Sequence, residues 1–279
     1  MAEPCDLTAT EARRLIGQGK LSPVDLVESC IARIEAVNPS VNAVVTKAYD
    51  RARSEAKEAA AKVSRGEPLA LLHGLPVLIK DINDTEGIRT TYCSPLFTDN
   101  VPTADDPIVT RIRAAGGIVL GKTNTPEFAT GSNTTNSVFG PTCNPFDTNL
   151  TSGGSSGGAG ASLATYMAPL ASGSDSAASI RNPAAYCGVV GIRSTPGVVA
   201  SHTRKMGLSN NGVEGPMART VADLALFFAV LAQPDPRDLL SKPLERVISP
   251  TLGHVDVSSL RVGFSEDLGF ARVDGRSPI

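Results

Sequence analysis

Two loops rich in small residues carry the serines that could do chemistry in this chain. The first reads Gly-Gly-Ser-Ser-Gly-Gly over residues 153–158, and the second, residues 173–181, contains Ser176 and Ser179. Small residues allow the backbone to turn sharply and let a ligand approach backbone N–H groups closely. A serine hydroxyl becomes an effective nucleophile when a nearby base accepts its proton. The two loops therefore raise the hypothesis of an acyl-transfer site.

Lys80 is the residue best placed to be that base. It ends the apolar run 75–79, which is typical of a buried strand. Burial disfavours the charged form of a lysine and lowers its pKa toward neutrality, where the amine can accept a proton. A strand-end lysine that reaches water is the alternative reading of this residue. The three histidines fit no triad pattern, and no Gly-x-Ser-x-Gly motif is present.

The glycine loop has other readings. A phosphate-binding loop needs a lysine directly after its last glycine, and none follows Gly157 or Gly158. A dinucleotide-binding loop follows a strand, whereas polar residues 144–151 precede this one. A flexible linker would join separate domains, but apolar segments follow the loop closely. In the acyl-transfer reading, consecutive N–H groups before Ser179 could hold an oxyanion at the predicted turn into a helix.

The composition indicates a soluble globular protein. The chain has 279 residues, of which 41% are hydrophobic and 19% are charged, and its net charge is −2. The chain has no excess of basic residues, only 4% of its residues are aromatic, and it has no Trp. We therefore do not expect it to bind nucleic acid. No apolar run approaches the roughly 20 residues that a membrane-spanning helix needs.

The cysteines indicate a reducing compartment. Their number is odd at five, and no Cys-x-x-Cys pair occurs, so no metal or redox motif is predicted. Widely spaced unpaired thiols are typical of a cytoplasmic protein. The first residues show no secretory signal, which agrees with that location.

The apolar periodicity predicts an α/β fold. Helices are predicted over about 8–16, 22–37 and 49–64, with a strand at 41–46 between the last two. Further along, strands at 77–79, 118–120, 168–171, 189–192 and 260–264 alternate with helices at 108–115, 159–166 and 221–232. Thr8 with Glu11 predicts a capping box, and Thr220, with Asp223 three residues on, is predicted to cap the helix at 221–232. This order predicts a mixed, mainly parallel sheet covered by helices on both faces.

Several segments together resemble the amidase signature family. They read Gly-Leu-Pro-Val-Leu-Ile-Lys-Asp (74–81), Gly-Gly-Ser-Ser-Gly-Gly (153–158) and Gly-Ser-Asp-x-x-x-Ser-Ile-Arg-x-Pro-Ala (173–184). Three further segments, 121–128, 139–145 and 215–223, agree with the family as well. The resemblance spans almost the whole chain in the family's order. It implies one domain over 1–279, with N-terminal helices over about 1–65 and a catalytic α/β core over about 70–279.

The resemblance also implies roles for individual residues. Ser179 corresponds to the nucleophile, Ser155 to a bridging serine that follows a cis peptide bond, and Lys80 to the base. The resemblance implies three further groups of site residues, which would form an oxyanion hole, a pocket wall and a support for the loops. The implied oxyanion hole is Ser176, Ala177 and Ala178, the implied pocket wall is Ala129, Thr130 and Gly131, and the residues that would hold the loops are Ser156, Asp175 and Arg181.

The function implied by the resemblance is hydrolysis of a carboxylic amide through a serine acyl-enzyme. The substrate would be a small-molecule amide, and neither a metal nor an organic cofactor is implied. Two alternatives stay open: a glutamine-hydrolysing component of an amidotransferase, and a catalytically impaired relative or fragment that acts as a binding module. A homodimer is compatible with the sequence, which does not determine the oligomeric state.

Three departures from the family pattern bear on these expectations. The family usually has Gly-Gly where this chain has Ala177-Ala178, and an alanine would be strained there if the backbone takes positive φ. The segment 193–198 differs from the family's Lys-Pro-Ser/Thr-x-Gly-Arg. Family members are also longer, and their C-terminal part adds strands to the sheet. The resemblance therefore implies a C-terminally truncated domain with an exposed sheet edge.

Overall fold

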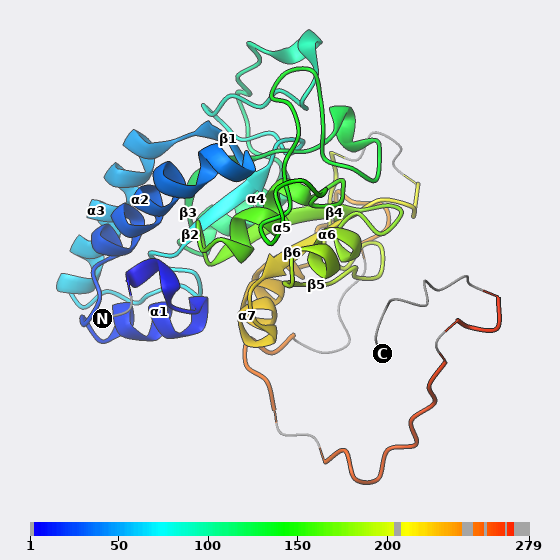
Figure 1. The fold of residues 1–279 in the computed structure, drawn as a ribbon. Coiled ribbons are helices and arrows are strands. Elements are labelled where there is room, and N and C mark those ends of the chain that lie inside the picture. The colour runs from blue at the N-terminus through cyan, green and yellow to red at the C-terminus, as the bar shows by residue number, and fades with distance from the viewer. Residues whose placement is uncertain (1–2, 204–207, 242–247, 254–255, 266, 271–279) are drawn as a thin grey trace.

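The structure is a computed structural model that describes residues 3–203, 208–241, 248–253, 256–265 and 267–270 (Figure 1). Six strands form one sheet in this part of the chain. Their bounds are β1 Val44–Lys47, β2 Pro76–Lys80, β3 Ile118–Thr123, β4 Leu170–Asp175, β5 Val190–Gly191 and β6 Val213–Ala218. All of these strands except β6 overlap the ranges that the sequence predicts.

The helices follow most of the predicted ranges. The α-helices are α1 Ala9–Gly17, α2 Pro23–Val41, α3 Tyr49–Ser64, α4 Pro107–Ala114, α5 Gly157–Ala164, α6 Arg181–Tyr186 and α7 Val221–Leu231. Short 3-10 helices are η1 Pro4–Asp6, η2 Pro95–Phe97 and η3 Glu127–Ala129. Helix α2 continues through Pro39, whereas the sequence predicts its end at that proline. It ends instead at Val41, and the left-handed conformation of the next residue, Asn42 (φ 52°), turns the chain toward β1.

The sheet is mixed, and most of its strands run in one direction. The strand order is β1-β3-β2-β4-β6-β5. Strands β3, β2 and β4 are parallel neighbours, β6 is antiparallel to β4, and β5 is antiparallel to β6. β5 therefore runs with the central strands, so four of the six share a direction while β1 and β6 oppose it. This confirms the predicted fold class.

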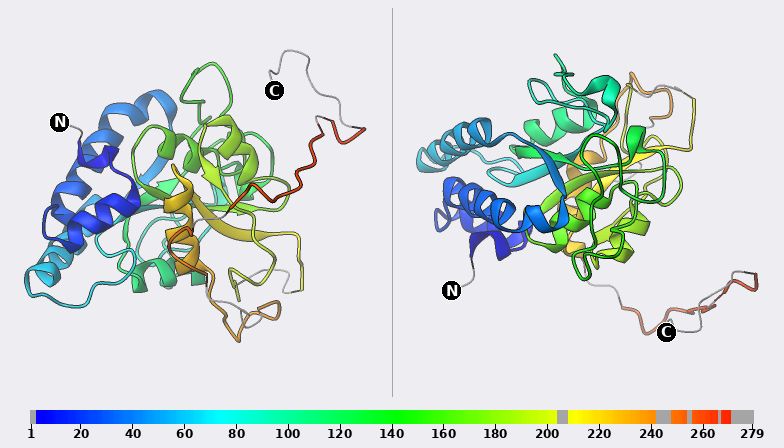
Figure 2. Two further views of the ribbon diagram at one scale, coloured as in Figure 1. Left: turned by 90° about the horizontal axis from the view of Figure 1, so that it is seen from below. Right: turned by 45° about the horizontal axis from the view of Figure 1, so that its top comes forward.

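Helices cover both faces of the central strands. Every residue of β2 and β3 is buried, which is typical of strands enclosed on both faces. Helices α4 and α7 pack together on one side of the sheet, and α5 and α6 pack together on the other (Figure 2). The Val77 side chain lies on the face covered by α4, near Ile112. The Lys80 side chain lies on the opposite face, near Ser156 at the start of α5. The alternation of side chains along β2 thus points Lys80 toward the glycine loop.

The predicted cap at Thr220 forms, and the predicted capping box at Thr8 forms only in part. The Thr8 hydroxyl accepts a hydrogen bond from Glu11 N–H at 3.2 Å, but the Glu11 carboxylate binds Arg14 instead of returning to Thr8. The Thr220 hydroxyl likewise accepts from Asp223 N–H at 3.1 Å. The buried Asp223 carboxylate instead accepts from Thr10 N–H at 2.8 Å, which ties the starts of α1 and α7 together. Tertiary partners outcompete the local ones here.

Two strand predictions need correction. Residues 260–264 form no strand, and their side chains are exposed, because no neighbouring strand supplies hydrogen bonds to them in the described structure. The sequence reading also misses β6, which pairs antiparallel with β4 along its whole length. Pro216 and Gly215 interrupt the strand pattern of β6, so periodicity alone does not reveal it. Among the described helices, none is long and apolar enough to cross a membrane.

Candidate active site

Lys80 lies at the end of β2 with its amine group among three serine hydroxyls. Its side chain is fully buried, and Nζ lies 2.7 Å from Ser155 Oγ, 2.9 Å from Ser156 Oγ and 2.9 Å from Ser174 Oγ. The Lys80 backbone N–H donates to Ser172 Oγ, which fixes the strand end on β4. The structure thus joins Lys80 and Ser155, two of the residues predicted to act together.

Burial changes the proton affinity of Lys80. Removal from water lowers the pKa of Lys80 to about 7, although Cys93, Asp175 and Glu214 act in the opposite direction. None of these groups forms an ion pair with Nζ, whose three bonds within the described residues all go to neutral hydroxyls. An amine in this state exchanges its proton near neutral pH, as a general base must.

The glycine loop brings Ser155 to Lys80 by close backbone packing. The Gly154–Ser155 peptide bond is cis, as the resemblance implies. A Cβ atom at Gly154 would lie 2.8 Å from the backbone of Ser132 and Asn133, so a larger residue does not fit there. Thr134 Oγ1, in the same segment, donates to the Gly153 carbonyl at 2.9 Å. The segment 132–134 therefore holds the loop from outside.

The loop of Ser179 is joined to the glycine loop by the backbone. Ser156 N–H donates to the Ser179 carbonyl at 3.1 Å, and Gly154 N–H donates to Asn182 Oδ1 at 3.3 Å. Ser179 itself is half-buried. Within the described residues, no hydrogen bond joins the Ser155 and Ser179 hydroxyls. The Ser179 backbone thus contacts Ser156, the residue after Ser155, and the relay between the two hydroxyls is not closed.

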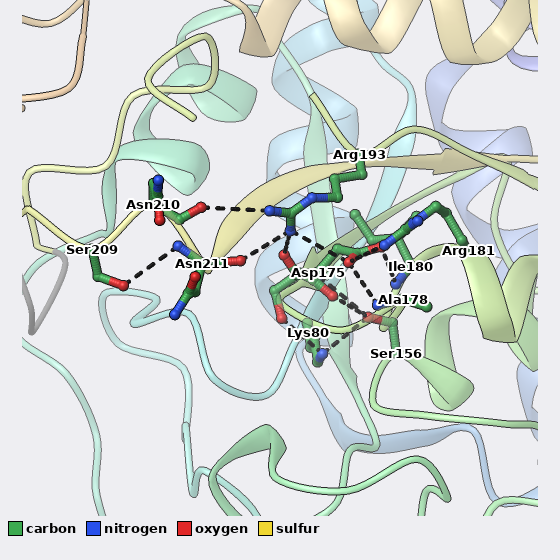
Figure 3. A network of polar contacts seen from close by, with 11 residues as sticks. Lys80, Ser156, Asp175, Ala178, Ile180, Arg181, Arg193, Ser209, Asn210 and Asn211 are labelled. Atoms are coloured by element: carbon green, nitrogen blue, oxygen red, sulfur yellow. Dashed lines mark hydrogen bonds and ion pairs between the residues drawn. The ribbon is translucent and has the colours of Figure 1, made fainter. Parts of the chain in front are cut away.

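Asp175 is the centre of a polar network that shapes the Ser179 loop (Figure 3). Its buried carboxylate accepts from the N–H groups of Ala178 at 2.9 Å and Ile180 at 3.2 Å. Two arginines also reach it: Arg181 donates twice, from Nε at 3.0 Å and Nη2 at 3.1 Å, and Arg193 approaches from the opposite side. Burial alone would raise the pKa of Asp175, but Arg181 and the N–H donors hold it below its usual value.

The oxyanion prediction is affected by this network. Because Ala178 N–H is bound by Asp175 Oδ1, it does not point toward a substrate, and the predicted role of Ala178 as a donor conflicts with this bond. The N–H groups of Ser176 and Ala177 form no hydrogen bond with the described residues, and both side chains are exposed. Ala178 also has φ 69°, the left-handed region that glycine favours. The expected strain at this position is therefore present.

The predicted pocket wall continues from η3. Ala129 is half-buried, whereas Thr130 and Gly131 are exposed. Next to them, the Phe128 ring packs with Tyr92 and Phe97, at centroid distances of 6.4 Å and 6.0 Å. Phe128 N–H donates to the Tyr92 carbonyl at 2.9 Å, so the two segments are fixed to each other. Half-exposed aromatic side chains thus border the predicted wall.

The sequence reading misses three residues of the network. Ser174 contacts Lys80 Nζ, although the sequence reading assigns it no role within the Gly-Ser-Asp motif. Thr134 supports the glycine loop, and Arg193 comes from a segment that the sequence marks only as a departure from the family. Period-two alternation along β4 could have indicated Ser174, because Ser172 and Ser174 share one side of that strand. No local pattern marks the other two.

Comparison with known proteins agrees with this arrangement. Residues 25–276 match the family model described as Amidase. The chain is 41% identical over 268 residues to an acylamidase from Rhodococcus erythropolis, covering 96% of this chain and 56% of that protein. It is 42% identical over 266 residues to one of the subunits of glutamyl-tRNA(Gln) amidotransferase from Streptomyces coelicolor, covering 94% and 53%. The chain spans about half the length of these curated relatives.

Solved structures show the same relationship. A bacterial aryl acylamidase of the amidase signature family superposes with a TM-score of 0.81 at 34% identity, covering 86% of this chain and 50% of that one. A 6-aminohexanoate cyclic dimer hydrolase in complex with its substrate gives a TM-score of 0.78 at 32% identity, covering 88% and 50%. The region matched by the family model includes both serine loops and the strand that ends at Lys80. The chain belongs to the amidase signature family.

Proposed function

We propose that this chain hydrolyses a carboxylic amide through an acyl-enzyme on Ser179. The observation that carries the proposal is the 2.7 Å contact between Ser155 Oγ and a buried Lys80 Nζ whose pKa is about 7. A lysine held this way can be neutral near physiological pH without a carboxylate partner. Family membership supports the same reaction class.

In the proposed first step, neutral Lys80 accepts the proton of Ser155, and Ser155 accepts the proton of Ser179. Ser179 Oγ then attacks the amide carbonyl, and the N–H groups of Ser176 and Ala177 stabilise the oxyanion. Rotation of the half-buried Ser179 side chain would close the hydrogen bond to Ser155, since catalytic contacts often tighten only when substrate binds.

The second half of the reaction uses the same groups in reverse. Lys80, now protonated, returns a proton through Ser155 to the leaving nitrogen, and the C–N bond breaks to release ammonia or an amine. Water then attacks the acyl-enzyme, and its proton passes along the same relay while the Ser179 ester is cleaved to a carboxylate. Each proton removed from a nucleophile is thus returned to a leaving group.

Turnover measurements on variants test the triad. Ser179→Ala and Lys80→Ala are each expected to lower kcat by roughly 100- to 10,000-fold, the range for loss of an acid–base or nucleophilic group. Ser54→Ala and Lys57→Ala, exposed positions on α3, are matched controls that should retain full activity. Near-normal turnover by folded Ser179→Ala or Lys80→Ala protein would refute the assignment.

A second candidate is the glutamine-hydrolysing component of an amidotransferase. Its support is the 42% identity to the relative from glutamyl-tRNA(Gln) amidotransferase. The half-exposed aromatic rings of Phe97 and Phe128 beside the predicted wall instead favour a substrate with an apolar acyl group. Comparing kcat/KM for glutamine with that for an aryl amide decides between them, and copurification of a second protein chain would favour the amidotransferase.

The third reading, an impaired relative or fragment that binds rather than catalyses, is supported by the occupied Ala178 N–H. A fluorophosphonate probe that fails to label Ser179 in folded protein would favour it. All five cysteines are free thiols, which supports the proposal of a reducing, cytoplasmic location. A homodimer is compatible with the sequence, and sedimentation velocity measures the oligomeric state.

A further inference from the structure

Ala178 adopts a backbone conformation that its side chain disfavours. Its φ of 69° lies in the left-handed region, where a Cβ atom approaches the following carbonyl oxygen. Two hydrogen bonds hold it there: its N–H donates to Asp175 Oδ1 at 2.9 Å, and its carbonyl accepts from Asn182 N–H at 2.7 Å. The next residue is Ser179, so the conformation of Ala178 sets where that hydroxyl lies.

Arg193 binds the backbone around Asp175 from another part of the chain. Nη1 donates to the Asp175 carbonyl, to Asp175 Oδ1 at 3.4 Å and to the Asn211 carbonyl at 3.0 Å. Nη2 reaches the Asn210 carbonyl at 3.4 Å. Figure 3 shows the guanidinium group lying between the Asp175 turn and the segment 210–211. One side chain therefore connects two segments that are not adjacent in the sequence.

The segment before β6 in turn lies against the nucleophile loop. A Cβ atom at Gly212 would be 3.2 Å from Ser176 Oγ, which puts residues 210–212 in contact range of the loop that Arg193 bridges. Arg181 also binds Asp175, but it follows the loop directly and its side chain is 54% exposed, compared with 24% for Arg193. Arg193 is thus the less exposed of the two clamps, and it attaches the loop to a separate element.

We propose that Arg193 is a positioning residue that, through Asp175, holds Ala178 in its left-handed conformation and so fixes the place of Ser179. The part that concerns Ser179 chemistry rests on the proposed function, whereas the conformational part does not. A planar guanidinium group can donate to several acceptors at once, as the four contacts here require, and a lysine ammonium group is less suited to this geometry.

The chemistry explains why this position matters here. A glycine at position 178 adopts positive φ without a steric cost, so a chain with glycine depends less on an external clamp. With alanine, the left-handed conformation carries a steric cost, so it depends on the hydrogen bonds that hold the turn, among them the bond from Ala178 N–H to Asp175. The arginine and the alanine are therefore predicted to be energetically coupled, and their effects should not add.

Hydrogen exchange measured by mass spectrometry tests this coupling without requiring turnover. The observed peptide would span residues 176–182, which contain the Ala178 and Ile180 N–H groups bound by Asp175. Arg193→Met is expected to speed exchange in this peptide by roughly tenfold, the effect of losing one hydrogen bond to a charged group. Arg193→Lys should give an intermediate rate, because the charge remains while the planar donors are lost.

Ala178→Gly supplies the decisive comparison. In that background, Arg193→Met should speed exchange by no more than about threefold, because glycine adopts the left-handed turn without the steric cost that alanine has there. Arg13→Met is the matched control, since Arg13 also binds two consecutive backbone carbonyls, those of Leu69 and Ala70, far from the loop. In the Arg13→Met variant, the 176–182 peptide should exchange at the same rate as in the unmodified chain.

The outcomes separate this proposal from the proposed function. Equal acceleration by Arg193→Met with and without Ala178→Gly, or no acceleration at all, would overturn the positioning role. Should Arg193→Met fail to fold, Arg193→Lys compared in the same two backgrounds decides the question. Labelling of Ser179 by a fluorophosphonate is then expected to slow in Arg193→Met and to recover in the double variant. Absence of labelling in every protein would refute the proposed function alone.

Discussion

Lys80 and Lys122 are both fully buried lysines, but they differ in the groups that their amines contact. Lys122 Nζ binds the Asn83 carbonyl and the hydroxyls of Thr85 and Thr90, and burial lowers the pKa of Lys122 to about 8. Nearby carboxylates, first among them Asp81, oppose that shift. Lys80 instead contacts Ser155, which follows the cis peptide bond beside the Ser179 loop. Burial thus creates two potential bases, and only the surroundings of Lys80 offer serines for a proton relay.

The pKa of Lys80 predicts how activity depends on pH. Because the base must be neutral and its pKa is about 7, kcat/KM should fall about tenfold per pH unit below that value and level off above it. Asp175, with its lowered pKa, stays ionised throughout this range and does not add a second limb. Initial rates across about four pH units measure the profile. A flat profile through neutrality in a protein that remains folded would contradict Lys80 as the base.

At the scale of elements, the start of α5 determines where Ser155 lies relative to Lys80. Its first turn packs directly on the end of β3: a Cβ atom at Gly158 would lie 2.4 Å from Asn124 N and 2.7 Å from the Ala43 carbonyl. Gly158 N–H also donates to the Asn124 carbonyl at 3.2 Å. Because backbone contacts backbone, neither side can move aside for a methyl group. The glycine is needed for approach rather than for conformation.

Gly158→Ala is therefore expected to destabilise the protein. Overpacking against backbone costs about 1–3 kcal/mol, more than the helix propensity of alanine returns. Chemical denaturation measures the free energy of unfolding, and Ser179 labelling should slow because Ser155 moves with the helix. Gly17→Ala is the matched control, since its nearest neighbour is the flexible end of Arg13 and the helix accommodates alanine. Equal stability of the two variants would show that the contact at Gly158 is not limiting.

At the scale of the whole molecule, the buried central strands differ from the exposed residues 256–265 in how far they are shielded from solvent. Strands β2 and β3 are buried at every position, whereas residues 256–265 form no regular element, and Val262 and Phe264 are 85% and 74% exposed. The run Leu-Arg-Val-Gly-Phe at 260–264 has the composition of a strand. An exposed apolar segment with strand propensity is a site for association with other chains.

We propose that this segment can mediate self-association, so replacing Val262 and Phe264 by lysine should reduce it without changing the stability of the fold. Both side chains lie outside the core, so the free energy of unfolding should change by less than about 0.5 kcal/mol. Sedimentation velocity at increasing protein concentration measures the association. Leu150→Lys, which removes a single exposed apolar side chain elsewhere, should have a smaller effect. An unchanged sedimentation profile for the double variant would exclude this segment as the contact.

Much of the fold follows from patterns that are local in the sequence. The helix at 49–64 is predicted to its boundaries, and the apolar runs at 77–79 and 118–120 mark the neighbouring strands β2 and β3. The sequence misses β6, because its glycine and proline weaken the strand pattern and its pairing with β4 spans distant residues. The expected strand at 260–264 fails for the opposite reason, since strand propensity without a partner does not form a sheet.

The candidate site divides in the same way. The small-residue loops and the apolar strand end are visible along the chain and make Lys80 and Ser179 candidates, whereas the roles of Lys80, Ser155 and Ser179 as a triad come from the family resemblance. Only the tertiary structure decides that Lys80 is buried among hydroxyls, that Ala178 is left-handed with its N–H occupied, and that Arg193 reaches Asp175. Burial, pKa and long-range hydrogen bonds depend on which segments pack together, and that packing is set by the whole chain.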